Sequence, residues 1–431
     1  MSFGAAVSRL AEQTPAQRNR VVDLMRAGSI LVVMLGHWTL AAVTVQDGRF
    51  TAGNILELAT WTHPLTWVFQ VMPVFFLVGG YVNGLSWRSA QRRGTSYGGW
   101  LRGRARRLLL PVVPVLLLWS VAGWWALQAG VGIGRLRLAS SVALMPTWFL
   151  ACYVLVVALA PVGLRLWDRW GWGSVLAGVL LAAVVDVLSL AMDSVTVGFV
   201  NYLVVWGTVH QVGFAWLDGR LASSRSRLLM ALVGLVGAVT LVTVGPYPVS
   251  MVGVSTATVN NTYPPRVTLV FLGLLQGGLL LLLEPAARRL TRRRRAWWLV
   301  VAVNARIMTL YLWHVAAMVV VIGTSLLLGG AGLGVEPLTA SWWLTRLLWY
   351  AVLAAVTLVL VACFGRFETP GVDPRPAPPP WRPLLAVAGA CAGLAALAVV
   401  GIADEHGLSW GLLLLPVVSV YVGGVARLPG R

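Results

Sequence analysis

The stretch that decides the fold is DLMRAGSILVVMLGHWTL, which runs from Asp23 to Leu40. It is long and apolar enough to cross a bilayer as a helix, because a span needs about 20 apolar residues. It nevertheless contains three ionisable residues, Asp23, Arg26 and His37. Such groups are costly at membrane depth and usually face the protein interior or a wet cavity. The stretch therefore predicts a first membrane helix that carries functional side chains.

The composition places the whole chain in the membrane class. Of its 431 residues, 58% are hydrophobic and only 11% are charged, whereas a soluble protein carries roughly 25% charged residues. All 33 basic residues are arginines, and the formal net charge is +19. The arginines lie in short loops between apolar runs, which indicates membrane topology and contact with membrane lipid or phosphate, so no nucleic-acid partner is expected. The three cysteines lie far apart inside apolar runs, so neither disulfides nor a metal site is expected.

Twelve apolar segments are candidates for membrane spans. Cytoplasmic loops are enriched in arginine, and only Arg49, Arg135, Arg137 and Arg266 fall in the loops that this count places outside. The predicted fold is an all-α polytopic membrane protein with both termini in the cytoplasm. The segments lie at about 21–45, 64–86, 108–129, 143–164, 173–192, 197–216, 227–246, 267–284, 297–327, 343–364, 383–402 and 408–426.

A proline-rich segment, GVDPRPAPPPW at residues 371–381, divides the chain. Its composition predicts an extended linker with neither helix nor strand. The predicted parts are a cytoplasmic N-terminal tail at 1–20, a ten-span body at 21–365, the linker at 366–382 and a two-span C-terminal tail at 383–431. The C-terminal tail has small residues and lacks polar groups within its spans, so we expect it to pack or to anchor.

Arg26 and His37 share a face of the first predicted helix. They lie eleven positions apart, which is about 20° past three full turns and about 16 Å along the helix axis. Asp23 precedes Arg26 by three positions and can pair with it on that face. The structural alternative is an aspartate–arginine pair at the membrane interface and a histidine bonded inside the bundle.

Two further polar residues lie within apolar runs. Asn83 is near the end of QVMPVFFLVGGYVNGLSW, residues 70–87, whose glycines allow close approach of another helix or of a ligand. His314 closes NARIMTLYLWH, residues 304–314. Together with Asp23, both are candidates for the lining of a substrate pocket, and for His314 a structural role is the alternative.

A cluster of four arginines precedes the third predicted span in RGRARRLLLPVVP, residues 102–114. Arginines at this place are often topology signals only. They also suit phosphate, because a guanidinium can bind phosphate oxygens with two hydrogen bonds. The candidate phosphate ligands are Arg102, Arg104, Arg106 and Arg107.

Five blocks together resemble the acyltransferase-3 family of integral-membrane acyltransferases. They are RNRVVDLMRAGSILVVMLGH, MPVFFLVGGYVNG, RARRLLLP, TWFLACYVLVVALAP and TLYLWH, and their order and spacing match over about residues 18–365. The resemblance implies a ten-span enzyme that takes an acyl group from cytoplasmic acyl-CoA and passes it to a hydroxyl of a saccharide, lipid or metabolite. The family's arginine–histidine pair corresponds to Arg26 and His37, which the resemblance makes the candidate catalytic residues. Its two arginines three apart correspond to Arg104 and Arg107.

The chain departs from the family pattern in its two-span tail, whose role the resemblance leaves open. It also lacks the soluble esterase-like domain of some relatives, which suggests direct transfer to the acceptor. The hypothesis that fits both residues and family has the arginines holding the CoA phosphates and His37 acting as general base, because histidine titrates near neutrality. A covalent acyl-histidine is a variant of this mechanism. No permanently bound cofactor is expected, and acyl-CoA is the donor co-substrate.

Two other classes of protein compete with an enzyme. A twelve-span secondary transporter has the same topology, but the halves of the chain show no convincing internal repeat. A non-catalytic lipid-binding protein would leave His37 and the glycine-rich second span unexplained. The absence of lysine suggests a GC-rich bacterial genome, and the expected location is the plasma membrane.

Overall fold

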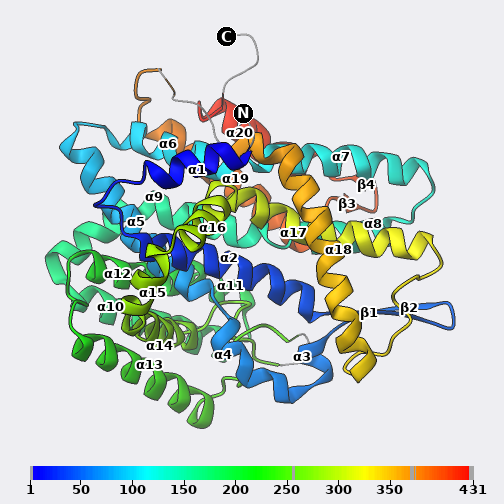
Figure 1. Cartoon of the computed structure of the whole chain (residues 1–431), viewed down its shortest axis with the longest axis horizontal. Helices are drawn as coiled ribbons and strands as arrows, with labels where there is room; N and C mark the ends of the chain where they lie inside the picture. The colour runs from blue at the N-terminus through cyan, green and yellow to red at the C-terminus, as the bar shows by residue number, and fades with distance from the viewer. Residues whose placement is uncertain (1–2, 255–257, 369–372, 374, 427–431) are drawn as a thin grey trace. The chain divides into compact units, whose positions relative to one another are not determined.

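The computed structural model describes residues 3–254, 258–368, 373 and 375–426 (Figure 1). The predicted linker and both predicted tails therefore lie partly outside the described residues, including Arg427 and Arg431 at the end of the chain. The chain forms two compact units, each built from three separate stretches. Unit 1 contains residues 1–33, 56–87 and 159–307, and unit 2 contains residues 34–55, 88–158 and 308–431.

The apolar segments of the sequence form helices. Within the described ranges, nine helices are long and apolar enough to cross a membrane, and a pair bent by 54° at Leu283 would be a tenth. The two remaining predicted spans, 197–216 and 408–426, correspond to shorter helices of 17 and 13 residues. The chain is thus a mostly helical, multi-pass protein, while the count of twelve and the cytoplasmic termini stay predictions.

Unit 1 is built from helices. Its elements are α1 Phe3–Glu12, most of α2 Arg20–Leu40, α3 Ile55–Leu58, η1 Thr60–Leu65, α4 Thr66–Phe69, most of α5 Met72–Arg92, the end of α9 Thr147–Trp170, α10 Trp172–Ala191, α11 Val195–Gly198, α12 Asn201–Leu217, α13 Ser224–Val244, α14 Thr268–Leu282, α15 Glu284–Arg292 and α16 Arg294–Ala305.

Glycines let neighbouring helices of unit 1 come together closely. A Cβ on Gly234 of α13 would lie 2.2 Å from the backbone nitrogen of Leu275 on α14. A Cβ on Gly80 of α5 would lie 1.9 Å from the carbonyl oxygen of His210 on α12. Helices that pack through small residues gain van der Waals contact in an apolar surrounding. The glycine-rich second span therefore serves helix packing.

Unit 2 contains helices and two short β-hairpins. Its elements are the end of α2, β1 Ala41–Gln46, β2 Arg49–Asn54, the end of α5, α6 Tyr97–Leu109, α7 Val112–Gln128, α8 Ile133–Leu144, the first half of α9, nearly all of α17 Ile307–Leu327, α18 Ala340–Phe364, η2 Gly365–Glu368, α19 Trp381–Val400, β3 Ala403–Asp404, β4 Gly407–Leu408 and α20 Trp410–Val422.

The first hairpin corrects the prediction that the first span runs from 21 to 45 in an all-α fold. Helix α2 ends at Leu40, and Ala41–Gln46 pairs antiparallel with Arg49–Asn54. Asp47 and Gly48 form the connection, with φ of 50° and 74°. A two-residue hairpin of this kind needs positive φ at both positions, which Asp-Gly adopts readily. The turn chemistry therefore ends the helix where hydropathy alone would extend it.

The C-terminal helices pack within unit 2. Helix α19 pairs with α20 and also contacts α6 and α8. Thr147 at the start of α9 donates a hydrogen bond of 2.9 Å to the carbonyl oxygen of Leu394 on α19. Within the predicted linker at 366–382, the described residues 373 and 375–380 form neither helix nor strand, as the proline content predicts. Residues 366–368 instead lie in η2, and 381–382 are the first residues of α19, so the linker is shorter than predicted.

Candidate active site

Two histidines from distant parts of the sequence meet in unit 2. His37 lies in the last turn of α2, and its Nδ1 is 2.8 Å from Nε2 of His314 on α17. The two rings are stacked, with centroids 5.1 Å apart and planes 6° from parallel. His314 has no exposed surface, whereas His37 is half-buried. The structure therefore brings together one residue predicted to be catalytic and one predicted to line the pocket.

The hydrogen bonds of His314 define which nitrogens carry protons. Its Nδ1 lies 2.7 Å from the carbonyl oxygen of Tyr311, and this oxygen can only accept. His314 Nδ1 therefore donates, and in a neutral ring Nε2 must be an acceptor. That acceptor takes a hydrogen bond from Nδ1 of His37, which leaves Nε2 of His37 with a free lone pair. Within the described residues no group is hydrogen-bonded to this Nε2.

The backbone around the pair is held from several directions. The indole of Trp38 donates a 3.0 Å hydrogen bond to the carbonyl oxygen of His314. The hydroxyl of Tyr311 donates to the carbonyl oxygen of Pro146. Thr39 and Tyr350 share a hydrogen bond of 2.7 Å between their hydroxyls. These contacts fix α2 and α17 against their neighbours, so the histidine geometry is rigidly supported.

The helical spacing allows Asp23 to pair with Arg26, but the structure does not show this pair. Its carboxylate accepts hydrogen bonds from Nε and Nη2 of Arg18, at 2.6 and 2.9 Å. This partner raises the pKa of the Arg18 guanidinium above its ordinary value. The main chain of Asp23 also accepts from the side chain of Asn304. The prediction of an aspartate–arginine pair within the helix is thus wrong, because a residue just before the helix reaches the carboxylate first.

Arg26 is left half-buried on α2 without that carboxylate. Among the described residues its guanidinium makes no ion pair or hydrogen bond. An arginine in this state is able to receive an anionic group from a ligand.

Asn83 lies in the packing between α5 and α12. It is 1% exposed, and its amide donates a 3.1 Å hydrogen bond to Nε2 of His210, which is 2% exposed. The close approach of α5 and α12 at Gly80 buries both side chains. The geometry gives Asn83 a place in helix packing within unit 1, and its predicted pocket role stays a prediction.

The four arginines of α6 lie on two faces of the helix. Arg102 and Arg106 are four positions apart, about 40° around the helix, and Arg104 and Arg107 are three apart, about 60° around it. Positions 102 and 104 are about 160° apart, so the two pairs point in different directions. The sequence cluster is therefore two sites of two arginines each.

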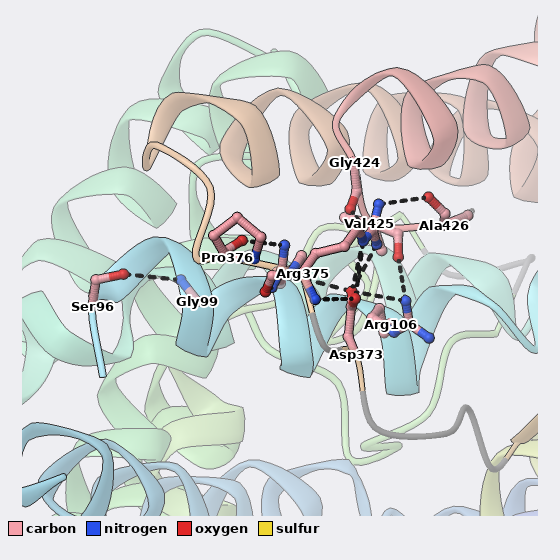
Figure 2. A network of polar contacts seen from close by, with 10 residues as sticks. Ser96, Gly99, Arg106, Asp373, Arg375, Pro376, Gly424, Val425 and Ala426 are labelled. Atoms are coloured by element: carbon pink, nitrogen blue, oxygen red, sulfur yellow. Dashed lines mark hydrogen bonds and ion pairs between the residues drawn. The ribbon is translucent and has the colours of Figure 1, made fainter. Parts of the chain in front are cut away.

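Arg102 and Arg106 hold the linker. Arg106 Nη1 lies 3.0 Å and Arg102 Nε 3.5 Å from the Asp373 carboxylate, while Arg375 approaches the same carboxylate to 2.7 Å (Figure 2). Arg102 also donates to the carbonyl oxygens of Pro376 and Arg375, at 2.9 and 2.8 Å. The hydrogen bonds that Arg375 donates to the Asp373 carboxylate raise the pKa of the Arg375 guanidinium. The linker thus occupies Arg102 and Arg106, two of the four predicted phosphate ligands.

The linker touches the start of α6 as well. A Cβ on Gly98 would lie 2.1 Å from the carbonyl oxygen of Pro378. Ser96 caps this helix by accepting a hydrogen bond from the backbone nitrogen of Gly99 (Figure 2). The first turn of α6 is therefore shaped to receive the proline-rich segment.

Arg107 interacts with a carboxylate that the sequence analysis did not select. Glu368, 4% exposed, lies close enough to Arg107 for an electrostatic interaction. Its oxygens accept hydrogen bonds from the backbone nitrogens of Met308 and Thr309, at 2.9 and 3.0 Å. Glu368 thus caps the N-terminus of α17, the helix that carries His314 two turns further on. An isolated glutamate at the end of an apolar run was the only signal for it.

The comparison with known families agrees with this geometry. The family model for the acyltransferase-3 domain, described as an acyltransferase domain, matches residues 19–366. The chain belongs to the acyltransferase-3 family. The predicted resemblance over residues 18–365 is thus confirmed, and the protein is a multi-pass membrane acyltransferase. The searches of curated proteins and of solved structures gave no match. In this acyltransferase-3 protein, the described residues contain no group of three histidine, cysteine or acidic side chains that could hold a metal ion.

Proposed function

We propose that this acyltransferase-3 protein moves an acyl group, acetyl or another short one, from cytoplasmic acyl-CoA to a hydroxyl. The acceptor is a saccharide, a lipid-linked molecule or a metabolite, and the location is the bacterial plasma membrane. The observation that carries the proposal is the hydrogen bond between His37 and His314, because it leaves a basic nitrogen on a half-buried ring. A neutral imidazole with a free lone pair is the ordinary general base for hydroxyl attack.

In the proposed reaction, Nε2 of His37 takes the proton from the acceptor hydroxyl as its oxygen attacks the thioester carbonyl. The new C–O bond forms, the C–S bond breaks, and the CoA sulfur leaves with the proton that His37 then returns. Nδ1 of His37 stays hydrogen-bonded to His314 throughout, which keeps the ring in one orientation. His314 is a positioning residue in this scheme, since it acts through His37.

The donor is proposed to bind through its phosphates. The proposed ligands are Arg104 and Arg107, which correspond to the two arginines three apart in the resemblance described above, whereas Arg102 and Arg106 already contact the linker. Arg26 contributes a further cation on the helix of His37, and its lack of a carboxylate supports a role toward an anionic ligand. The rise from Arg26 to His37, about 16 Å, is of the order of the neutral arm of CoA.

The test measures donor binding and transfer separately. Thermal unfolding of the purified full-length protein in neutral detergent is followed with CoA and acetyl-CoA, because a ligand of the folded state raises the midpoint. We expect a dose-dependent rise that the Arg104→Ala/Arg107→Ala variant loses. Transfer is measured as the passage of radiolabel from acetyl-CoA to membranes. The membranes come from native-host cells that lack their own copy of this protein. A protein that neither binds CoA or longer acyl-CoAs nor transfers label would refute the proposed function.

A further inference from the structure

Three arginines are buried in the described part of the chain, and one of them has no carboxylate partner. Arg102 pairs with Asp373, and Arg266 pairs with Asp186 at 3.3 Å. Arg346, 6% exposed on α18, makes no ion pair with any described residue. Buried cations in proteins are normally paired, because their desolvation is costly. Arg346 therefore differs in kind from the other two.

Aromatic rings hold the Arg346 guanidinium in place. It lies 4.0 Å from the ring centroid of Trp342 and 5.0 Å from that of Trp349. Its Nη1 reaches the carbonyl oxygen of Ala41 at 3.5 Å, just past the C-terminus of α2. Cation–π contacts and the negative end of a helix both favour a cation here. They fix the position of the guanidinium without neutralising its charge.

Two buried hydrogen-bond donors remain unused beside each other. Nε of Arg346 and Nε1 of Trp342 are both shielded from solvent, and neither has a hydrogen-bond partner among the described residues. An indole N–H can only donate, and a guanidinium has no acceptor. Buried polar groups are nearly always hydrogen-bonded, so each exception calls for an explanation. A cation with two orphan donors is complementary to an oxyanion.

This cluster lies next to the catalytic end of α2. Ala41 follows His37 by four positions, which is about one helical turn. The indole of Trp349 donates a 3.0 Å hydrogen bond to the carbonyl oxygen of Trp38. All of these residues belong to unit 2. In the predicted topology, this start of α18 is also opposite the arginine-rich, donor-binding side.

We propose that Arg346 and Trp342 bind an anionic oxygen group, a carboxylate or a phosphate, on the acceptor. The assignment to the acceptor rests on the proposed function, because CoA presents its phosphates elsewhere. The acceptor hydroxyl would then be oriented toward His37 by a charge about one turn away. The acceptor class is thereby narrowed to acidic saccharides or phosphate-linked carriers.

The test uses anions without any acyl-CoA, so that its outcome is independent of the transferase assay. Thermal unfolding of the full-length protein in neutral detergent is titrated with glucuronate, glucose 1-phosphate and glucose. We expect a saturable rise in the midpoint with one or both anions, none with glucose, and none in Arg346→Gln. The matched control is Arg382→Gln, because Arg382 also stacks on a tryptophan but is exposed, and this variant should keep the rise.

The remaining outcomes are equally decisive. Trp342→Phe keeps the ring and removes one donor, so it should raise the half-saturating concentration about fivefold, the value of one net hydrogen bond. It serves as the test if Arg346→Gln does not fold.

A rise with glucuronate alone identifies a carboxylate, and one with glucose 1-phosphate alone identifies a phosphate. A rise in the midpoint only with phosphatidylglycerol in mixed micelles assigns the site to a lipid headgroup. This outcome overturns the proposal that the anion belongs to the acceptor. An equal rise in Arg346→Gln, or no rise with any anion, overturns the site.

Discussion

Two histidine clusters, one in each unit, use the same side chain in opposite ways. In unit 1, Nε2 of His210 is occupied by the amide of Asn83, and the ring meets Phe214 edge-on at 5.0 Å. In unit 2, His314 fills only Nδ1 of His37, and the outer nitrogen remains available. The side chains of Asn83 and His210 are both buried, which makes the first cluster closed to a ligand, whereas the ring of His37 is half-buried. In each cluster one nitrogen of this histidine ring makes a hydrogen bond among the described residues and the other does not, so the difference lies in burial. An unused ring nitrogen therefore points to chemistry where the ring is only half-buried, as in His37.

The most direct way to break this comparison is to remove the open histidine. We expect His37→Ala to lower the transfer rate by about 10²- to 10⁴-fold, because a general base is lost. The midpoint shift caused by CoA should be retained, since the donor ligands are untouched. His406→Ala, at a histidine whose side chain is 95% exposed, is the control and should transfer normally. An active His37→Ala protein would remove the basis of the proposed mechanism.

The next test separates positioning from mere packing in the open cluster. His314→Leu leaves Nδ1 of His37 without an acceptor, and we expect kcat to fall about tenfold or more, in line with one lost buried hydrogen bond. The KM for acetyl-CoA should not change. His314→Gln offers an amide oxygen to the same N–H and should recover most of the rate. If the leucine and glutamine variants lose activity equally, His314 does not act by accepting this hydrogen bond.

The closed cluster should respond in stability and not in catalysis. Asn83→Ala removes the donor to His210 within a buried contact, so we expect a loss of about 1–3 kcal/mol in the free energy of unfolding. Transfer per folded molecule should stay the same. The measurements are the unfolding midpoint and the rate normalised to folded protein. A tenfold loss of rate with an unchanged midpoint would restore the predicted pocket role of Asn83.

Hydropathy was sufficient to locate most of the helices, since nine helices of the described residues are long and apolar enough to cross a membrane and each of them overlaps a predicted span. It did not foresee that the predicted span 297–327 is divided between α16, which ends at Ala305, and α17, which begins at Ile307. It failed at 41–45, where AAVTV is as apolar as a helix and the Asp47–Gly48 turn decides for a hairpin. The Asp-Gly dipeptide is a turn signal in the sequence itself, and it is sufficient to end the first span before the hairpin.

The candidate site was predictable in residue type and only partly in partners. The family blocks selected His37 and His314. Their contact joins residues 277 positions apart, and residue spacing within one helix cannot predict such a tertiary contact. Helical spacing paired Asp23 with Arg26, whereas the preceding loop delivers Arg18. Local periodicity describes one helix at a time, so it cannot foresee a partner supplied by another segment.

A last comparison is between the two faces of α6, one with Arg102 and Arg106 and the other with Arg104 and Arg107. Its smallest expected effect is the change in CoA affinity when the face that holds the linker is altered. Arg102→Gln/Arg106→Gln removes two charges from the face filled by Asp373 and the linker. Arg104→Gln/Arg107→Gln removes the same number from the other face, so net charge is matched.

We expect the first variant to lose about 1–3 kcal/mol of stability through broken charged hydrogen bonds, with less than about a threefold change in CoA affinity. The second should lose CoA affinity about tenfold or more, since bonds to charged groups contribute about 1.5–3 kcal/mol each. Titration of CoA against the unfolding midpoint of both variants measures the two effects together. Equal losses of affinity would mean that the linker gives way to the donor, and that Asp373 occupies a place that a phosphate takes during turnover.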